Sequence, residues 1–142
     1  MIKFYKNTDP FGFCSNFYPC KFYLYSKWWT NVEAAYQAKK CVNQEDFELI
    51  WNAKSPREAR NLGQKVKLID GWDTIKYCIM LECVLAKFLQ NPNLAAELLT
   101  SGDEELVEDS TVDYYWGCGK DGSGLNMLGK VLTEVRSILK EK

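Results

Sequence analysis

Histidine is absent from this sequence of 142 residues. Its absence excludes catalysis by Ser-His-Asp or Cys-His groups, because both use an imidazole as the general base. It also excludes metal sites built on histidine ligands. Proton transfer, if the protein is an enzyme, must therefore fall to aspartate, glutamate, lysine, tyrosine or cysteine side chains.

Long hydrophobic runs and closely paired cysteines are missing too. We see no stretch of 18 apolar residues and no signal peptide, so we expect a soluble, cytoplasmic protein of a bacterial cell or a virus-infected host, with no membrane partner. The six cysteines form no Cys-x-x-Cys pair, which argues against a structural zinc site. We expect reduced thiols that pack as small hydrophobic groups, and no metal.

Net charge is also low, at −1, which argues against strong binding of polyanions by the whole surface. The charges are unevenly distributed, since Lys54–Lys67 is rich in lysine and arginine whereas Asp103–Asp113 carries only acidic charges. The basic segment either meets phosphate groups or forms a solvent-facing helix surface, and the charge pattern alone favours the second interpretation.

The apolar residues that are present predict a single domain over residues 1–142, since hydrophobic residues make up 46% and charged residues 26% of the chain. We predict an α+β fold, mainly helical, with a small N-terminal antiparallel sheet. Its strands are expected at Ile2–Tyr5, at Lys21–Tyr25 and from Trp28 onward. Helices are expected at Thr30–Cys41, Glu45–Ala53, Ser55–Gly63, Asp70–Gln90, Asn93–Thr100 and after Gly124, while Glu105–Glu108 is an edge strand or a turn.

The predicted helix Asp70–Gln90 is apolar almost all round, which is typical of a central, buried helix. The helix before it, Ser55–Gly63, is expected to end at a C′ glycine. At Thr30–Cys41 the pattern predicts a capping box, with Thr30 as the N-cap and Glu33 at the third helical position. This capping role alone explains a glutamate there.

A glycine-rich segment, Asp113–Gly129, precedes the last helix and reads DYYWGCGKDGSGLNMLG. Its Gly-x-Gly-x-x-Gly spacing matches a dinucleotide-binding fingerprint, but no hydrophobic strand precedes it as that fold requires. A glycine loop at a helix N-terminus can offer free N–H groups to an anion such as phosphate. The segment is therefore either a ligand-binding loop or an ordinary turn, and its own sequence does not decide between them.

Several separated motifs occur in one order: GFCSNFYP, NVEAAYQAKK, SPREARNLG, GWD, MLECVLAKF and DYYWGCGKDGSGLNMLGKVLTEVR. Together they resemble the NADAR family of YbiA-like proteins over nearly the whole chain. The resemblance implies a compact, mainly helical α+β domain with N-glycosidase activity and no cofactor. Members of the family release ADP-ribose from guanine in DNA or act on phosphoribosyl intermediates of riboflavin synthesis.

The resemblance also implies a site. It places the catalytic glutamate at Glu33 and the two site tryptophans at Trp72 and Trp116. Asp113 would be the second carboxylate. We expect Glu33, Trp72, Asp113, Trp116 and Asn126 to meet in one pocket, which Lys40 should also line. Other positions that match the family pattern are expected to bind substrate: Ser15, Asn16, Lys40, Asn126, Gly117, Gly119 and Gly122.

Two positions depart from the family pattern. Ala34-Ala35 stand where His-Tyr often follows the glutamate, and Gln64 stands where arginine is frequent. We expect the first change to open space or remove contacts beside Glu33, and the second to weaken phosphate binding.

Three functions are compatible with these residues. The first is hydrolysis of the N-glycosidic bond between ADP-ribose and a guanine base in nucleic acid. The binding partner would then be an ADP-ribose-containing substrate such as ADP-ribosylated DNA. The second is hydrolysis of a phosphoribosyl or ADP-ribosyl small molecule. The third is a non-catalytic module that binds ADP-ribose or a nucleotide, which an intact pair of Glu33 and Asp113 disfavours.

Overall fold

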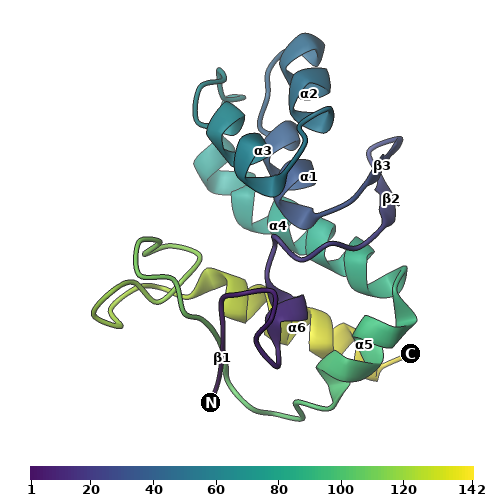
Figure 1. Cartoon of the computed structure of the whole chain (residues 1–142), viewed down its shortest axis with the longest axis vertical. Helices are drawn as coiled ribbons and strands as arrows, with labels where there is room; N and C mark the ends of the chain where they lie inside the picture. Colours follow the sequence, from purple (N-terminus) through teal and green to yellow (C-terminus); the bar gives the residue numbers. More distant parts are fainter.

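The computed structural model describes residues 1–142 and shows six α-helices and two small sheets (Figure 1). This confirms the mainly helical α+β class. None of the helices is long and apolar enough to cross a lipid bilayer. In chain order the elements are β1 (Ile2–Phe4), the 3-10 turn η1 (Gly12–Cys14), β2 (Phe22–Leu24), β3 (Lys27–Trp29), α1 (Val32–Lys39), α2 (Gln44–Trp51), α3 (Pro56–Gly63), α4 (Trp72–Leu89), α5 (Pro92–Leu99), β4 (Leu106–Glu108) and α6 (Met127–Lys140).

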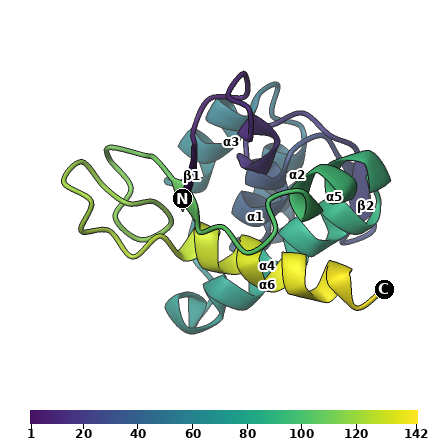
Figure 2. The ribbon, with the colours of Figure 1, turned by 90° about the horizontal axis from the view of Figure 1, so that it is seen from below.

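Helix α4 runs through the middle of the molecule, with α1, α2 and α3 on one side and α5 and α6 on the other (Figure 1). Seen from below, α6 lies against α4, and the segment 109–125 projects beyond them as an extended loop (Figure 2). The core-facing side chains of α4 include Met80, Cys83 and Phe88, all buried, while Ile79 and Leu85 are partly buried. The prediction of a central helix is thus confirmed, and its apolar residues lie mostly against neighbouring elements.

The predicted N-terminal antiparallel sheet is only partly correct. β2 and β3 form an antiparallel hairpin in which Phe22 pairs with Trp29. β1, however, is not part of it, because it pairs in parallel with β4 and places Ile2 opposite Leu106. A strand of three residues carries no signal for so distant a partner, so the sequence pattern alone could not show this pairing.

Helix α1 is capped by Asn31, one residue later than predicted. The Asn31 side chain accepts a hydrogen bond from the Ala34 N–H at 2.8 Å, and this bond takes the role expected of Thr30. Glu33 therefore occupies the second helical position, and its carboxylate is not needed for a capping box. The physical reason is that asparagine is at least as good an N-cap as threonine.

The end of α3 also differs from the prediction. Gly63 is the last helical residue and has no positive φ, so it is not a C′ glycine. A side chain at this position would collide with the Gln37 side chain of α1. Glycine is therefore present because α1 and α3 pack closely there.

Candidate active site

A polar cleft lies between the N-terminal loop, α1, α3 and the end of β4. It consists of two cavities of about 350 and 190 Å³, which share the lining residues Asn16, Glu33, Arg60 and Glu108. We call the two cavities together the Glu33 cleft. Only 2 of the 12 residues that line the larger cavity are hydrophobic, so this cavity suits a polar ligand.

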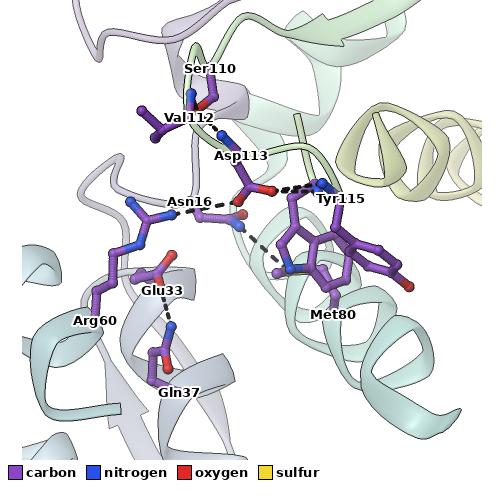
Figure 3. A network of polar contacts seen from close by, with 10 residues as sticks. Asn16, Glu33, Gln37, Arg60, Met80, Ser110, Val112, Asp113 and Tyr115 are labelled. Carbon is purple, nitrogen blue, oxygen red and sulfur yellow. Dashed lines mark hydrogen bonds and ion pairs between the residues drawn. The ribbon is translucent and has the colours of Figure 1, made fainter. Parts of the chain in front are cut away.

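Glu33 lies in the first turn of α1 and is only 6% exposed. Its N–H donates to the Asn16 carbonyl at 3.1 Å, and its carboxylate accepts a hydrogen bond from the Gln37 amide at 2.6 Å (Figure 3). Burial raises the pKa of Glu33, while the Gln37 hydrogen bond and the positive charges of Arg60 and Lys40 oppose that rise. The side chain is thus held in one orientation in a poorly solvated place, as a catalytic carboxyl must be.

The loop that carries Ser15 and Asn16 is held by the buried Lys87 of α4. The Lys87 ammonium donates to the carbonyls of Phe13 at 2.6 Å and Ser15 at 3.1 Å. The Asn16 amide nitrogen donates to the Met80 sulfur, which leaves the buried Asn16 Oδ1 without a hydrogen-bond partner. Ser15 and Asn16 both line the Glu33 cleft, as predicted.

Asp113 enters the cleft from the extended loop. One of its carboxylate oxygens accepts hydrogen bonds from the N–H groups of Tyr115 at 3.0 Å and Trp116 at 2.8 Å. The other oxygen forms an ion pair with Arg60 at 3.6 Å (Figure 3). Asp113 lines the smaller cavity with Glu33, but most of its bonding capacity is used to fix the loop and α3.

The two predicted site tryptophans have different positions. Trp116 lines the smaller cavity, and its ring meets the edge of Tyr36 with centroids 5.5 Å apart. Trp72 packs on the same tyrosine at 5.3 Å but does not line the cleft. Trp72 therefore supports Tyr36, and Trp116 alone of the two presents its ring to a ligand in the cleft.

Positive charge comes to the cleft from several elements. Lys40 lines the smaller cavity, as predicted, and burial lowers its pKa. Arg57 and Arg60 of α3, together with Lys6, line the larger cavity. The expectation that Lys54–Lys67 forms only a solvent-facing surface is thus wrong for these two arginines. Their spacing of three residues, which places them on one helix face, is the signal that could have found them.

Glu108 is a second cleft carboxyl that the sequence pattern did not single out. Burial raises its pKa to about 7, and the negative charges of Asp113 and Glu33 add to the rise while Arg60 opposes it. Its buried Oε2 has no hydrogen-bond partner, and neither has the buried amide oxygen of Asn16 or Gln37. These three atoms are the only buried, unpartnered side-chain polar atoms of the chain, and all three residues line the smaller cavity. Such a concentration is typical of a site that binds a polar ligand or ordered water.

The three glycines of the glycine-rich segment that were expected to bind substrate do not line the Glu33 cleft. Gly117, Gly119 and Gly122 line neither of its cavities. The first N–H groups of α6, at Met127 and Leu128, donate to loop carbonyls and are not free for an anion. The loop folds back on these two N–H groups, which favours the ordinary turn over the ligand-binding loop at this helix N-terminus.

Asn126 also lies outside the cleft. Its side chain joins α6 to β4, since its amide nitrogen donates to the Leu106 carbonyl at 2.9 Å and its oxygen accepts from the Glu108 N–H at 3.0 Å. The structure thus assigns Asn126 a positioning role for Glu108 rather than a direct contact with a ligand.

The family model of the NADAR domain matches residues 3–140. The chain belongs to the NADAR family. It is 44% identical to the N-glycosidase Npun_R5314 of Nostoc punctiforme, covering 95% of this chain and 90% of that protein. It is 35% identical to the N-glycosidase YbiA of Escherichia coli K12, covering 98% and 88%.

The NMR structure of the E. coli protein YbiA superposes on this NADAR chain with a TM-score of 0.91 and 34% identity, covering 99% of this chain and 84% of that one. The chain is also 38% identical to the riboflavin biosynthesis protein VVA0006 of Vibrio vulnificus, of which it spans 39%. With N-glycosidases as relatives over most of their length, this NADAR protein is a hydrolase.

Proposed function

We propose that this NADAR protein hydrolyses the N-glycosidic bond between ADP-ribose and a guanine base in nucleic acid, and that it thereby releases ADP-ribose. The observation that supports it most is the combination of groups in the Glu33 cleft. The buried Glu33 and the half-buried Glu108, whose Oε2 is buried, lie beside a cluster of cations, Lys6, Lys40, Arg57 and Arg60, within one polar cavity system. The carboxyls suit the reacting sugar, and the cations suit a diphosphate.

Breaking an N-glycosidic bond develops positive charge on the sugar ring as the base departs. A carboxylate next to that ring stabilises the charge or takes a proton from the attacking water. Glu33 suits this role because it is buried, held by Gln37 and has one oxygen that accepts no hydrogen bond within the protein. The Trp116 ring on the smaller cavity offers a flat surface on which a base can stack.

Phosphate binding is assigned to the arginines rather than to the glycine loop. Arg57 has no ion-pair partner, so its guanidinium is available to a phosphate group. Arg60 is shared with Asp113 at 3.6 Å, which couples the phosphate side of the cleft to the loop that carries Trp116. Lys40 adds charge at the smaller cavity, where Gln64 also lies.

A second candidate is hydrolysis of a phosphoribosyl intermediate of riboflavin synthesis, or of another small ADP-ribosyl compound. The similarity to the Vibrio riboflavin biosynthesis protein favours it. The same carboxyls and cations would serve a single phosphate. A non-catalytic ADP-ribose-binding module is the third candidate, and the positioned Glu33 carboxylate argues against it.

The test is a mass-spectrometric assay of the purified protein against an oligonucleotide with ADP-ribosyl-guanine and against phosphoribosyl riboflavin intermediates. We expect release of ADP-ribose and recovery of intact guanine from the oligonucleotide. Cleavage of the riboflavin intermediates alone would favour the second candidate. Binding of ADP-ribose without any cleavage would favour the third and contradict the proposal.

The phosphate assignment has its own prediction. Arg57→Ala should raise KM roughly tenfold or more, because a charge-assisted hydrogen bond to phosphate contributes about 1.5–3 kcal/mol. Lys65→Ala is the matched control, since Lys65 is an exposed cation of the same segment that does not line the cleft. Equal KM values for the two variants would contradict the assignment.

A further inference from the structure

Glu108 is held in place from both sides of its backbone. It is the last residue of β4, its N–H donates to the Asn126 side chain at 3.0 Å, and its carbonyl accepts from the Cys118 N–H at 2.9 Å. Leu106 and Val107 before it are buried. The side chain therefore enters the Glu33 cleft from a fixed strand end, and it lines both cavities together with Glu33.

No structural role explains the carboxyl group. Its Oε2 is buried without a partner, and neither carboxyl oxygen forms a hydrogen bond or an ion pair. The position is nevertheless close-packed, since a side chain on Gly117 would approach Oε2 to 3.0 Å. A buried carboxylate without a partner destabilises a protein, so such a group is retained for what it does to a ligand or is held as the neutral acid.

The surroundings of Glu108 favour its protonated, uncharged form at pH values near 7. The groups that face Glu108 are Glu33 from α1, Arg60 from α3 and Asp113 from the extended loop. Two of these three are acidic, and the one cation, Arg60, is already paired with Asp113. Burial and these negative charges raise the pKa of Glu108 to about 7, so it carries a proton for part of the time at neutral pH.

We infer that Glu108 is the general acid of the reaction and gives its proton to the departing base, while Glu33 receives a proton from the attacking water. The C1′–N bond breaks, and its electron pair goes to the base, which takes the proton of Glu108. Water forms the new C1′–O bond and loses a proton to Glu33. Exchange of both protons with solvent restores the two carboxyls, so the reaction consumes only water.

This division of roles rests on the N-glycosidase reaction and not on which base departs. Asp113 is less suited to either role, because one of its oxygens accepts two backbone N–H groups and the other pairs with Arg60. Two carboxyls with different surroundings, one orienting water and one protonating the leaving group, are a recurrent arrangement in glycoside hydrolysis.

The test compares Glu108→Gln on two oligonucleotides, one with ADP-ribosyl-guanine and one with the 7-methylguanine analogue, whose positive ring departs without being protonated. We expect kcat to fall roughly a hundredfold or more on the first and about tenfold or less on the second, with KM little changed. An equal loss on both, or no loss on the first, would overturn the role of Glu108. Glu33→Gln should slow the cleavage of both substrates. Glu105 is an exposed acid of the same segment as Glu108, and Glu105→Gln should slow the cleavage of neither.

The pH profile is a second readout that holds for whichever substrate the wild-type protein cleaves. The wild-type kcat should fall above an apparent pKa of about 7, because Glu108 must be protonated to act. Glu108→Gln should lack this descending limb. A limb that persists in the variant would overturn the inference, whereas wild-type inactivity on both oligonucleotides contradicts only the proposed substrate.

Discussion

The presence of glutamate at position 33 could be explained either by helix capping or by catalysis. A glutamate in the first turn of a helix is ordinary, and its sequence position is compatible with capping alone. The structure removes that explanation, because Asn31 caps the helix and the Glu33 side chain bonds Gln37 inside a polar cleft. The residue is buried at a cost in solvation that capping would not require.

Glu33→Gln should therefore slow turnover by roughly a hundredfold or more while leaving folding and ligand binding largely intact. Glutamine has nearly the same shape but can neither accept a proton from water nor stabilise a cationic sugar. Base release and thermal unfolding are measured on the same preparation. Asn31→Ala is the comparison, and it should lower stability by about 1 kcal/mol because it removes the cap. An unchanged rate in Glu33→Gln would remove this residue from the mechanism.

The candidate site could be predicted from the sequence only in part. The residues of the predicted set that do line the Glu33 cleft are Ser15, Asn16, Glu33, Lys40, Asp113 and Trp116. Trp72, Asn126 and the three loop glycines matched the same motifs, yet they line neither cavity of the cleft: Trp72 packs on Tyr36, and Asn126 joins α6 to β4. A motif records which positions are restricted, but it does not separate contact with a ligand from support of the residue that makes the contact.

Glu108 was missed for a different reason. It lies in an acidic segment where glutamate is unremarkable, and its importance comes from burial next to Glu33, 75 residues earlier in the chain. Burial and long-range neighbours are properties of the tertiary fold, so no local pattern reports them. The two arginines of the cleft, Arg57 and Arg60, could more easily have been predicted from the sequence, because their spacing places them on one face of a helix.

At the level of elements, the contact between α1 and α3 connects packing to catalysis. Gly63 of α3 lies directly against the Gln37 side chain, and Gln37 in turn donates to Glu33. The close approach of the two helices thus determines the orientation of the candidate catalytic carboxylate. Arg60 of α3 and Lys40, the residue that follows α1, both line the smaller cavity.

Gly63→Ala should displace Gln37 and break its hydrogen bond to Glu33. We expect a loss of about 1–3 kcal/mol of stability from overpacking, together with a fall in kcat. Urea unfolding and base release measure the two effects. Adding Gln37→Ala should recover most of the stability, because it makes room for the new methyl group, but it should not recover kcat. Additive stability losses in the double variant would contradict this coupling.

The helices were the part of the fold that the sequence predicted well. Their apolar periodicity and their caps are local, as at Ser55 and Pro56, which begin α3 as expected. The pairing of β1 with β4 could not be predicted, because it depends on two strands of three residues that lie about 100 positions apart.

At the level of the whole molecule, the buried carboxyls predict an unusual dependence of stability on pH. The pKa of Glu108 in the folded protein, about 7, lies above the ordinary glutamate value of 4.5, and the pKa of Glu33 is also raised. The folded state therefore binds protons more tightly than the unfolded state. The stabilisation is fully present below pH 4.5 and is lost as the pH rises through about 7.

The free energy of unfolding should thus fall between pH 5 and pH 8, on the order of 3 kcal/mol from Glu108. No histidine titrates in this range to obscure the effect. Urea unfolding at several pH values measures it, and Glu108→Gln should flatten the curve. A wild-type stability that rises steadily from pH 5 to pH 8 would show that Glu108 is not held as the neutral acid.

The parallel pairing of β1 with β4 also determines when the Glu33 cleft can form during synthesis of the chain. During synthesis the helix with Glu33 leaves the ribosome early, but the wall with Glu108 cannot form until β4 has emerged and joined the N-terminal strand across roughly 100 residues. Asn126, which fastens that wall to α6, follows later still. A nascent chain should therefore be inactive until β4 and the start of α6 have been made and have folded onto the earlier segments.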